Sequence, residues 1–426
     1  MKNNSINYLY KKFEETNGVS IDSRSIKNDQ LFFALKGPNF DGHKYIINAK
    51  KNGAKYAVID DESYSYFGFT ILVSDVEKAL QDLARYHRMF VRIPVIGLTG
   101  SNGKTTTKEL IYSVLSEKFN VLATIGNLNN HLGVPLSILR IDKNHEIAII
   151  EMGANKPLEI EFLSRIAMPD IGIITNIGKA HLEGFINIEG VLKAKTELYK
   201  YLESTKGKIF YNLNEERLIN SLPNSTDNIP YSIDDIDVFD SFPTLSFNYK
   251  EIRFTSQLSG RFNAFNIMTA IKIGEYFDLT ISQIKSGIEN YNPQNNRSQI
   301  KITDKNTLIL DAYNANPSSM KASILNVANS LTSGDKVLIL GHMLELGESS
   351  KSEHAEIIQY IQKWDWTQVI LVGSEFINIT VPQKFDCFTD VTECIDTFFS
   401  EKIIVGSTVL LKGSRGATLE KLVPYL

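Results

Sequence analysis

The sequence predicts an α/β protein of three domains built on largely parallel sheets, and two observations carry this prediction. Short apolar runs alternate with helical patterns along most of the chain. A polar stretch at 292–298 interrupts the alternation, which then restarts. We therefore expect a small N-terminal α/β domain at 1–92, a central parallel-sheet domain at 93–298 and a C-terminal Rossmann-like α/β domain at 299–426.

Strands are expected where the apolar runs contain β-branched or aromatic residues and lie between turn signals. In the N-terminal domain these runs are 31–35 and 56–59. In the central domain they are 95–99, 121–124, 147–151, 171–175 and 208–211. In the C-terminal domain they are 308–311, 337–340, 369–372 and 408–411. The continuous apolar character of the last set predicts parallel strands that are buried on both faces.

Composition and charge exclude several classes of protein. Hydrophobic residues make up 43% and charged residues 22% of the 426 residues, which suits a folded protein with several cores. The formal net charge of -4 argues against a nucleic-acid or anionic membrane partner. Apolar runs fall short of the ~20 residues of a membrane span. The N-terminus lacks the apolar core of a signal peptide, and the two cysteines suit free thiols in a reducing compartment. We expect a cytoplasmic monomer.

A Gly-rich turn joins the run Val95–Thr99 to a helical pattern, and this turn is the most informative feature of the chain. The turn, Gly100–Thr106, contains Lys104 and Thr105. A strand, a glycine loop and a helix N-terminus form a phosphate cradle, because backbone N–H groups and the helix dipole face the anion. Lys104 would reach the outer phosphates, and Thr105 would hold Mg²⁺. Leu98 replaces the first glycine of the common spacing, so a helix cap with a chance Gly-Lys-Thr is the alternative.

Two polar residues follow strands near this loop. Glu151 ends the run 147–151, and His181 lies shortly after the run 171–175. Ligands of doubly wound sheets gather beyond the carboxyl ends of strands, and a carboxylate there suits Mg²⁺ coordination. A solvated charge at a strand end is the alternative for Glu151. His181 is an unusual Mg²⁺ ligand, and a position outside any site is as well supported for it.

Two further groups are ambiguous from the residues alone. Asn127, Asn129 and Asn130 follow the strand-like run 121–124, where a turn and a substrate contact are equally compatible with the sequence. Lys195 lies in an amphipathic helical stretch, where a solvated lysine is the ordinary interpretation.

Three polar loops follow strands of the C-terminal domain, at 311–317, 341–347 and 412–416. The carboxyl ends of neighbouring parallel strands meet at one edge of a sheet, so the three loops together predict a binding rim. Lys412 and Arg415 would suit an anionic ligand there.

Taken together, these residues resemble the Mur ligase family, the ATP-dependent enzymes that build the peptide of peptidoglycan, over essentially the whole chain. Gly100–Thr106 resembles the family phosphate loop, and Glu151, His181 and Lys195 match its central positions. The stretches that look most like the branch adding D-alanyl-D-alanine are 126–130, 151–155, 311–317, 343–347 and 411–415. Those that resemble its uridine-nucleotide domain are 22–24, 31–35 and 41–43.

The resemblance implies an ATP-dependent ligation with ATP and two Mg²⁺ ions as cofactors. ATP would phosphorylate the terminal carboxylate of UDP-N-acetylmuramoyl-tripeptide, and the amine of D-Ala-D-Ala would attack the acyl phosphate. The implied catalytic residues are Lys104, Glu151, His181 and Lys195. The implied metal ligands are Thr105, Glu151, His181 and a carbamylated Lys195. The implied nucleotide contacts are Gly100, Asn102, Gly103, Lys104, Thr105, Thr106, Asn263, Asn266, Arg297 and Asp311. The implied substrate contacts are Ser23, Arg24, Asn127, Asn129, Asn130, Asn314, Asn316, Lys412 and Arg415.

Two positions depart from the family pattern. His342 stands where similar chains usually carry Asp, and we expect this loop position to tolerate Asp. Phe262 replaces the usual His or Tyr beside the adenine but keeps an aromatic face.

Two alternatives stay open. One is a sister ligase, either another Mur step or a folylpolyglutamate-type enzyme, although the N-terminal motifs argue against folate. The other is an inactive nucleotide-binding scaffold, against which the retention of Lys104 and Lys195 argues.

Overall fold

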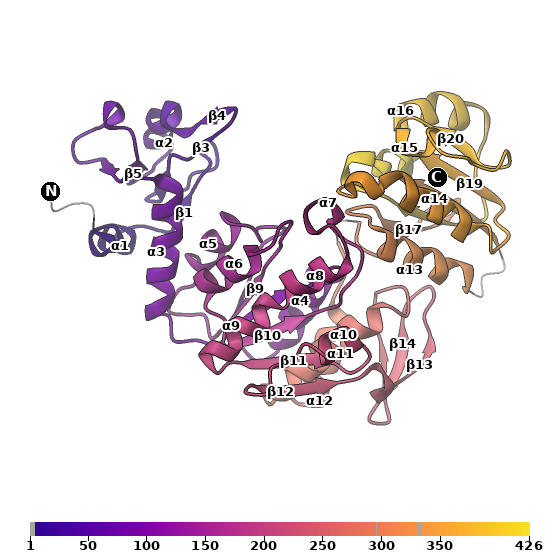
Figure 1. Ribbon diagram of the computed structural model, residues 1–426, viewed down its shortest axis with the longest axis horizontal. Coiled ribbons are helices and arrows are strands. Elements are labelled where there is room, and N and C mark those ends of the chain that lie inside the picture. The colour runs from indigo at the N-terminus through magenta and orange to yellow at the C-terminus, as the bar shows by residue number, and fades with distance from the viewer. Residues whose placement is uncertain (1–4, 295, 331–333) are drawn as a thin grey trace.

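The protein folds into three α/β domains, each with its own sheet, as the sequence predicts. The computed structural model describes residues 5–294, 296–330 and 334–426. The N-terminal and C-terminal domains lie on opposite sides of the central one (Figure 1). Of the predicted polar linker at 292–298, residue 295 lies outside the described residues.

A four-stranded parallel sheet of order β1-β2-β5-β6 forms the N-terminal domain. Its strands are β1 (Val19–Ser20), β2 (Leu31–Phe33), β5 (Tyr56–Ile59) and β6 (Thr70–Leu72), with a hairpin of β3 (Lys36–Gly37) and β4 (Phe40–Asp41). Its helices are α1 (Ile6–Glu14), α2 (Ile46–Lys51) and α3 (Val76–Phe90). The side chain of Asp75 accepts the N–H of Lys78 and fixes the start of α3. Helix α3 packs against two helices of the central domain and so connects the two domains.

The central sheet has six parallel strands in the order β12-β11-β10-β7-β9-β8. The strands are β7 (Val95–Thr99), β8 (Val121–Ala123), β9 (Ile147–Glu151), β10 (Ile171–Ile174), β11 (Lys208–Asn212) and β12 (Asp227–Tyr231). The helices are α4 (Lys104–Leu115), α5 (Gly133–Ile138), α6 (Glu159–Ala167), α7 (Leu182–Phe185), α8 (Ile188–Lys195), α9 (Glu197–Thr205), α10 (Glu216–Ile219), α11 (Asn263–Tyr276) and α12 (Ile281–Asn290). All residues of β7, β9 and β10 are buried, so helices cover both faces of the sheet.

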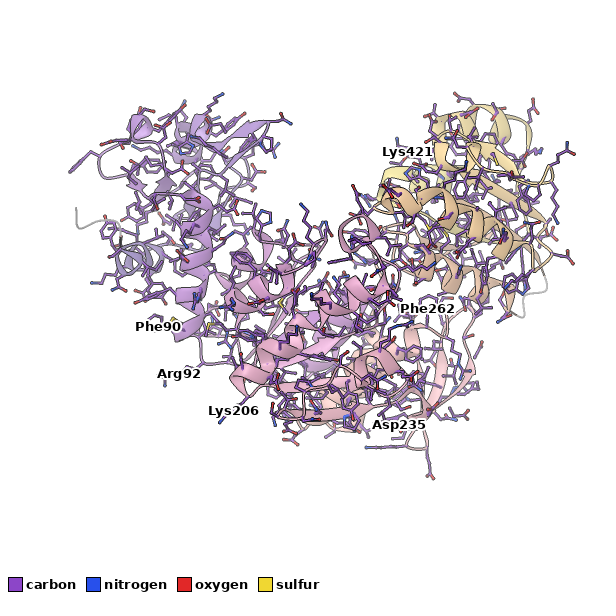
Figure 2. All side chains as sticks on the ribbon, viewed as in Figure 1. Phe90, Arg92, Lys206, Asp235, Phe262 and Lys421 are labelled. Carbon is purple, nitrogen blue, oxygen red and sulfur yellow. The ribbon has the colours of Figure 1, made fainter. Side chains whose placement is uncertain are left out.

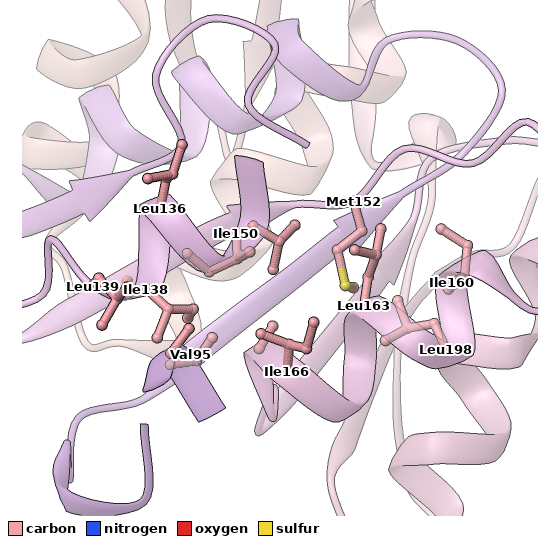
Figure 3. Packing of buried hydrophobic residues seen from close by; sticks show 14 of the residues in the cluster. Val95, Leu136, Ile138, Leu139, Ile150, Met152, Ile160, Leu163, Ile166 and Leu198 are labelled. Carbon is pink, nitrogen blue, oxygen red and sulfur yellow. The ribbon is translucent and has the colours of Figure 1, made fainter. Parts of the chain in front are cut away.

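Alternate residues of the central strands pack into two separate cores. Val95 and Ile150 lie in the core beneath α5 and α6, where they meet Ile138, Leu163 and Ile166 (Figure 3). The residues of β7 that point the other way, Ile96 and Leu98, lie in a second core with residues of α4 and α11. The sheet is thereby fixed from both sides, and the loops at its carboxyl edge are left to form a site.

A small antiparallel sheet follows β12, and the sequence does not predict it. It consists of β13 (Ile236–Asp240), β14 (Ser246–Tyr249) and β15 (Ile252–Thr255). The tight turn between β14 and β15 holds Lys250 and Glu251 at φ 48° and 63°. Such turns usually carry Asn or Gly. The hairpin therefore lacks the local sequence signal that would have revealed it.

The C-terminal sheet has the order β16-β17-β21-β18-β19-β20, and its edge strand β16 is antiparallel to β17. The strands are β16 (Gln299–Ile302), β17 (Thr307–Asp311), β18 (Asp335–Gly341), β19 (Gln368–Val372), β20 (Asp386–Phe388) and β21 (Ser407–Lys412). The helices are α13 (Pro317–Ala328), α14 (Ser350–Ile361), α15 (Ser374–Ile377) and α16 (Val391–Cys394). The four predicted runs of this domain all lie within its parallel strands. Across the described parts of the chain, no helix is long and apolar enough to cross a membrane.

Candidate active site between the central and C-terminal domains

A cavity of about 790 Å³ lies where the carboxyl ends of the central strands face the C-terminal domain. Strands β10, β7 and β9 are neighbours in the central sheet, so Thr175, Gly100 and Glu151 meet at one edge. In the C-terminal sheet, β17 pairs with β21, which sets Asp311 opposite Lys412. Both sheets therefore contribute their strand ends to the same cavity.

The phosphate loop depends on two glycines. Gly100 has φ 142°, and a Cβ on it would lie 2.0 Å from Thr175 Oγ1. Gly103 has φ 78°, and a Cβ there would lie 2.5 Å from Asn266 Oδ1. Helix α4 begins directly after Gly103, and no described side chain caps it. Its first N–H groups are thus available to an anion.

Lys104 is folded back onto this loop. Its Nζ donates to the backbone oxygens of Gly100 at 2.6 Å and Ser101 at 3.3 Å. Burial lowers the pKa of Lys104 from its usual value, and the carboxylate of Glu151 opposes that shift. An anion in the loop would offer Nζ a stronger acceptor than these carbonyls.

Glu151 is 1% exposed, so the alternative of a solvated strand-end charge is wrong. Its Oε2 accepts a hydrogen bond from Thr105 Oγ1 at 3.0 Å, and its Oε1 accepts one from Asn129 Nδ2 at 2.8 Å. Lys108, which the sequence analysis missed, lies 3.9 Å from Oε2 and is itself buried. Lys108 follows Lys104 by one helical turn, and that spacing is the signal that could have placed it on the same face. A hydroxyl beside a carboxylate offers the hard oxygen ligands that Mg²⁺ favours.

Lys195 is wholly buried, which contradicts the interpretation as a solvated lysine. Its Nζ donates to the backbone oxygen of Ala154 at 3.2 Å and lies 5.3 Å from the ring centre of Phe185. Burial lowers the pKa of Lys195 well below its usual value, and the charge of Lys104 lowers it further. The buried Val191 precedes Lys195 by one helical turn, so the helical period does place the lysine on the apolar face.

His181 contacts the C-terminal domain through a glutamate that the sequence analysis missed. Its Nδ1 lies 2.5 Å from Glu345 Oε2, and the imidazole lowers the pKa of Glu345 while burial opposes that shift. Glu345 lies in the loop 341–347, which was predicted as part of the rim without a role for this residue. Within the described ranges, no three His, Cys, Asp or Glu side chains form a ready metal-binding cluster. Thr105 and Glu151 are the side chains whose contact best fits a Mg²⁺ ion.

The predicted nucleotide contacts lie beside the phosphate loop. Asn266 Nδ2 donates to Asn263 Oδ1 at 2.8 Å, and Asn266 Oδ1 accepts from Thr107 Oγ1 at 3.0 Å. Phe262 lies on the side of the central domain that faces the C-terminal domain (Figure 2). Across the cavity the guanidinium of Arg297 lies 3.6 Å from the ring centre of Tyr313, which sequence reasoning missed. The cavity lining also contains Asn102, Thr106, Asn127, Asn130 and Asn314.

Asp311 binds two neighbouring side chains at the C-terminal rim of the cavity. Its Oδ2 accepts from Lys412 Nζ at 2.9 Å and from Ser323 Oγ at 2.8 Å. Lys412 Nζ also donates to the backbone oxygen of Asn314 at 2.9 Å. The ion pair leaves Lys412 fixed rather than mobile, as a positioning role requires.

Three predicted substrate residues lie away from the cavity lining. Arg415 is 5.9 Å from the ring centre of Tyr313 but does not line the cavity. Ser23 and Arg24 belong to the N-terminal domain, where the Arg24 side chain is 87% exposed and pairs with Asp22. That ion pair lowers the pKa of Asp22 to about 2.

His342 lies beside an acidic residue that the sequence could not reveal, and this neighbour bears on the expectation that Asp is tolerated there. The Nδ1 of His342 lies 3.5 Å from Glu375 Oε2, at the start of α15. A His342→Asp change would set two carboxylates against each other. We now expect it to lower the free energy of unfolding by about 1–2 kcal/mol.

Chemical denaturation of His342→Asp beside His342→Asn measures this effect. The Asn variant removes the imidazole without adding charge, so it should lose less stability. Equal stability of the Asp variant and the parent protein would show that Glu375 does not act on this position.

Comparisons with known proteins agree with this architecture. The family domain described as "Mur ligase middle domain" matches residues 98–274, and "Mur ligase, glutamate ligase domain" matches residues 296–415. "Mur ligase family, catalytic domain" matches residues 15–93.

Relatives of known name match along nearly the whole chain. A UDP-N-acetylmuramoyl-tripeptide--D-alanyl-D-alanine ligase of Bacillus subtilis (strain 168) is 35% identical, over 97% of this chain and 94% of its own. The ligase of that name from Escherichia coli (strain K12) is 32% identical, over 96% of this chain and 93% of its own. The MurF ligase of Thermotoga maritima, solved in complex with ADP, superposes with a TM-score of 0.83 at 28% identity, covering 96% of this chain and 97% of that one. The chain belongs to the Mur ligase family.

Proposed function

We propose that the protein is an ATP-dependent ligase that joins D-alanyl-D-alanine to UDP-N-acetylmuramoyl-tripeptide. One observation carries the proposal: the phosphate loop, the buried Glu151–Thr105 contact and the C-terminal rim line one cavity. Relatives that carry this name cover nearly the whole chain. In this proposal the domain at 1–92 binds the UDP-linked substrate, 93–298 binds ATP and 299–426 binds the acceptor, in a cytoplasmic monomer.

The first step is transfer of the γ-phosphoryl group of ATP to the terminal carboxylate of the UDP-linked peptide. A carboxylate oxygen forms the new P–O bond, the bond to the β-phosphate oxygen breaks, and ADP leaves. Lys104 and the first N–H groups of α4 would hold the phosphates and stabilise charge as it moves to the leaving oxygen. Mg²⁺ neutralises phosphate charge when bound, and Thr105, Glu151 and His181 would hold it.

The second step is attack of the amine of D-Ala-D-Ala on the acyl phosphate. The new C–N bond forms and the attacking nitrogen loses one proton to water; the carbon–oxygen bond to phosphate breaks after a tetrahedral intermediate, and inorganic phosphate leaves. Positioning of two substrates supplies much of the rate of such a reaction. Lys412, fixed by Asp311, and Asn316 would orient groups at the rim.

Lys195 is the proposed site of a carbamate. Its buried amine has a lowered pKa, and a neutral amine is the form that reacts with CO₂. The amine nitrogen forms a bond to the carbon of CO₂ and loses one proton to water, so the product is an anion with two hard oxygens in place of a cation that would repel Mg²⁺. In this proposal the carbamate would join His181 and Glu151 as a metal ligand.

Product analysis with competing acceptors tests the proposed function. The enzyme, ATP and UDP-N-acetylmuramoyl-tripeptide are offered D-Ala-D-Ala, D-Ala and glutamate together, and the UDP-linked products are identified by mass spectrometry. We expect the adduct of UDP-N-acetylmuramoyl-tripeptide with D-Ala-D-Ala as the single product. A glutamate adduct, or glutamylation of an added folate, would support the sister-ligase alternative instead, and no adduct at all would favour the inactive scaffold.

Glu151→Gln tests the proposed metal contact. We expect the Mg²⁺ concentration for half-maximal activity to rise roughly ten- to a hundredfold, because the amide offers no charge to the ion. Glu109→Gln is the matched control, since Glu109 lies on α4 and pairs with Lys108 at 3.0 Å but is half-buried and does not line the cavity. An unchanged Mg²⁺ requirement in a folded Glu151→Gln protein would remove Glu151 from the metal site.

A further inference from the structure

The loop that follows β10, residues 175–181, lies between the phosphate loop and the C-terminal domain. On its first side, Asn176 Nδ2 donates to the backbone oxygen of Asn102 at 3.0 Å. The N–H of Gly178 donates to Ser101 Oγ at 2.9 Å. Any displacement of this loop therefore acts directly on the phosphate loop.

On its second side, Lys179 binds two helices of the C-terminal domain. Its backbone N–H donates to Ser318 Oγ, in the first turn of α13, at 3.1 Å. Its Nζ donates to Glu353 Oε1 on α14 at 2.6 Å and lies 3.6 Å from Glu356 Oε2. A single residue thus joins the phosphate-loop side of the central domain to two elements of its neighbour.

The two glutamates differ in their exposure and in whether they have an ion-pair partner besides Lys179. Glu356 is partly exposed and also pairs with Lys321 of its own domain at 3.0 Å. Glu353 is 5% exposed, and Lys179 is the only basic side chain within ion-pair distance of it in the described structure. Its Oε2 is buried without a hydrogen-bond partner among the described residues. Removal of one partner from a buried ion pair leaves an uncompensated charge, which is strongly destabilising.

We infer that Lys179 and Glu353 are a positioning pair that seats the C-terminal domain against the phosphate loop for ligation. With Lys179 in place, the Glu353 carboxylate is compensated only when the two domains are docked. Without it, docking no longer brings a basic partner to Glu353, so the docked arrangement loses the stabilisation of the ion pair. The inference rests on the proposed function for its activity readout, but the geometry of docking is independent of the substrate.

The burial of the two side chains predicts an asymmetry between variants. Lys179→Met should lower kcat roughly tenfold or more, because Glu353 then stays buried without a partner. Glu353→Gln should lower kcat less than Lys179→Met does, because the side chain of Lys179 is 39% exposed and water can solvate its charge. The double variant should recover from the level of Lys179→Met towards that of Glu353→Gln, since it no longer buries a lone charge. A purely local structural role for Lys179 would not produce that recovery.

The experiment compares the full-length parent, the two single variants and the double variant by kcat and by small-angle scattering without substrates. We expect a larger radius of gyration for Lys179→Met only. Lys321→Met is the control, because it removes a neighbouring lysine whose ion pair lies within one domain. If Lys179→Met does not fold, folding of the double variant supports the inference and its failure to fold overturns it.

Two outcomes overturn the inference in a folded set of variants: a double variant no more active than Lys179→Met, or unchanged scattering of Lys179→Met. Failure of the proposed function is distinguishable from both. It would leave the parent protein without ligase activity, while the scattering comparison would still report whether the pair docks the domains.

Discussion

Replacement of Lys104 by alanine should lower turnover roughly a hundred- to a thousandfold while leaving the fold intact. The reason is that, among the described residues, Nζ donates only to backbone oxygens of the phosphate loop, at 2.6 and 3.3 Å, and Lys104 does not belong to their apolar cores. The proposed role of Lys104 is therefore to stabilise the negative charge that develops on the leaving phosphate oxygen. Turnover with all substrates, alongside a thermal unfolding curve, measures the effect.

Lys118→Ala is the matched control for this variant. Lys118 follows the far end of α4 and donates to backbone oxygens of Phe277 and Asp278, so its loss leaves the cavity unchanged. The control should keep normal turnover. If folded Lys104→Ala also kept it, the assignment of Gly100–Thr106 as the phosphate loop would fail.

Lys195→Ala should lose most turnover, on the order of a hundredfold or more, while still binding ATP. The carbamate is the proposed metal ligand, whereas the phosphate loop holds the nucleotide through other residues. A short carboxylic acid added to the variant should restore part of the activity by supplying the missing oxygens. Lys193→Ala is the control, because Lys193 is exposed on the same helix and should be dispensable.

The chemistry of the modification gives this prediction a pH dependence and a direct readout. Burial holds the pKa of Lys195 well below its usual value, which increases the share of neutral amine at any given pH, and acid decreases that share by protonation. Activity should therefore fall in acidic, CO₂-free buffer and recover at neutral pH with bicarbonate. A crystal structure should show three extra atoms on Nζ. An unmodified, solvent-facing Lys195 in an active, nucleotide-bound enzyme would refute the assignment.

The parallel strands and the phosphate loop were predictable because their signals are local. The strands β5 and β9 match the predicted runs residue for residue. The reason is that continuous apolar runs bounded by turns usually form buried strands in an α/β protein. The hairpin whose turn contains Lys250 was not predicted, because that turn lacks the Asn or Gly that such turns usually carry. In that case the tertiary fold, rather than local preference, decided the backbone.

The site was predictable as a set of strand ends but not as a set of contacts. Glu345 and Tyr313 reach the cavity through loops whose course depends on packing between domains. Lys195 is buried because it lies on the apolar face of α8. The helical spacing indicates this position, but lysine is usually exposed, so the spacing was not interpreted as burial. His342 shows the converse: similar chains usually carry Asp at this position, whereas in this chain the imidazole Nδ1 lies 3.5 Å from Glu375 Oε2, a neighbour that the sequence could not reveal.

Phosphate release with each component omitted in turn tests the central claim most directly. The complete mixture contains the protein, ATP, Mg²⁺, UDP-N-acetylmuramoyl-tripeptide and D-Ala-D-Ala. We predict sustained release of phosphate from the complete mixture and loss of that release when the UDP-linked peptide, D-Ala-D-Ala or Mg²⁺ is left out. Equal release without either substrate, or no release from the complete mixture, would contradict it.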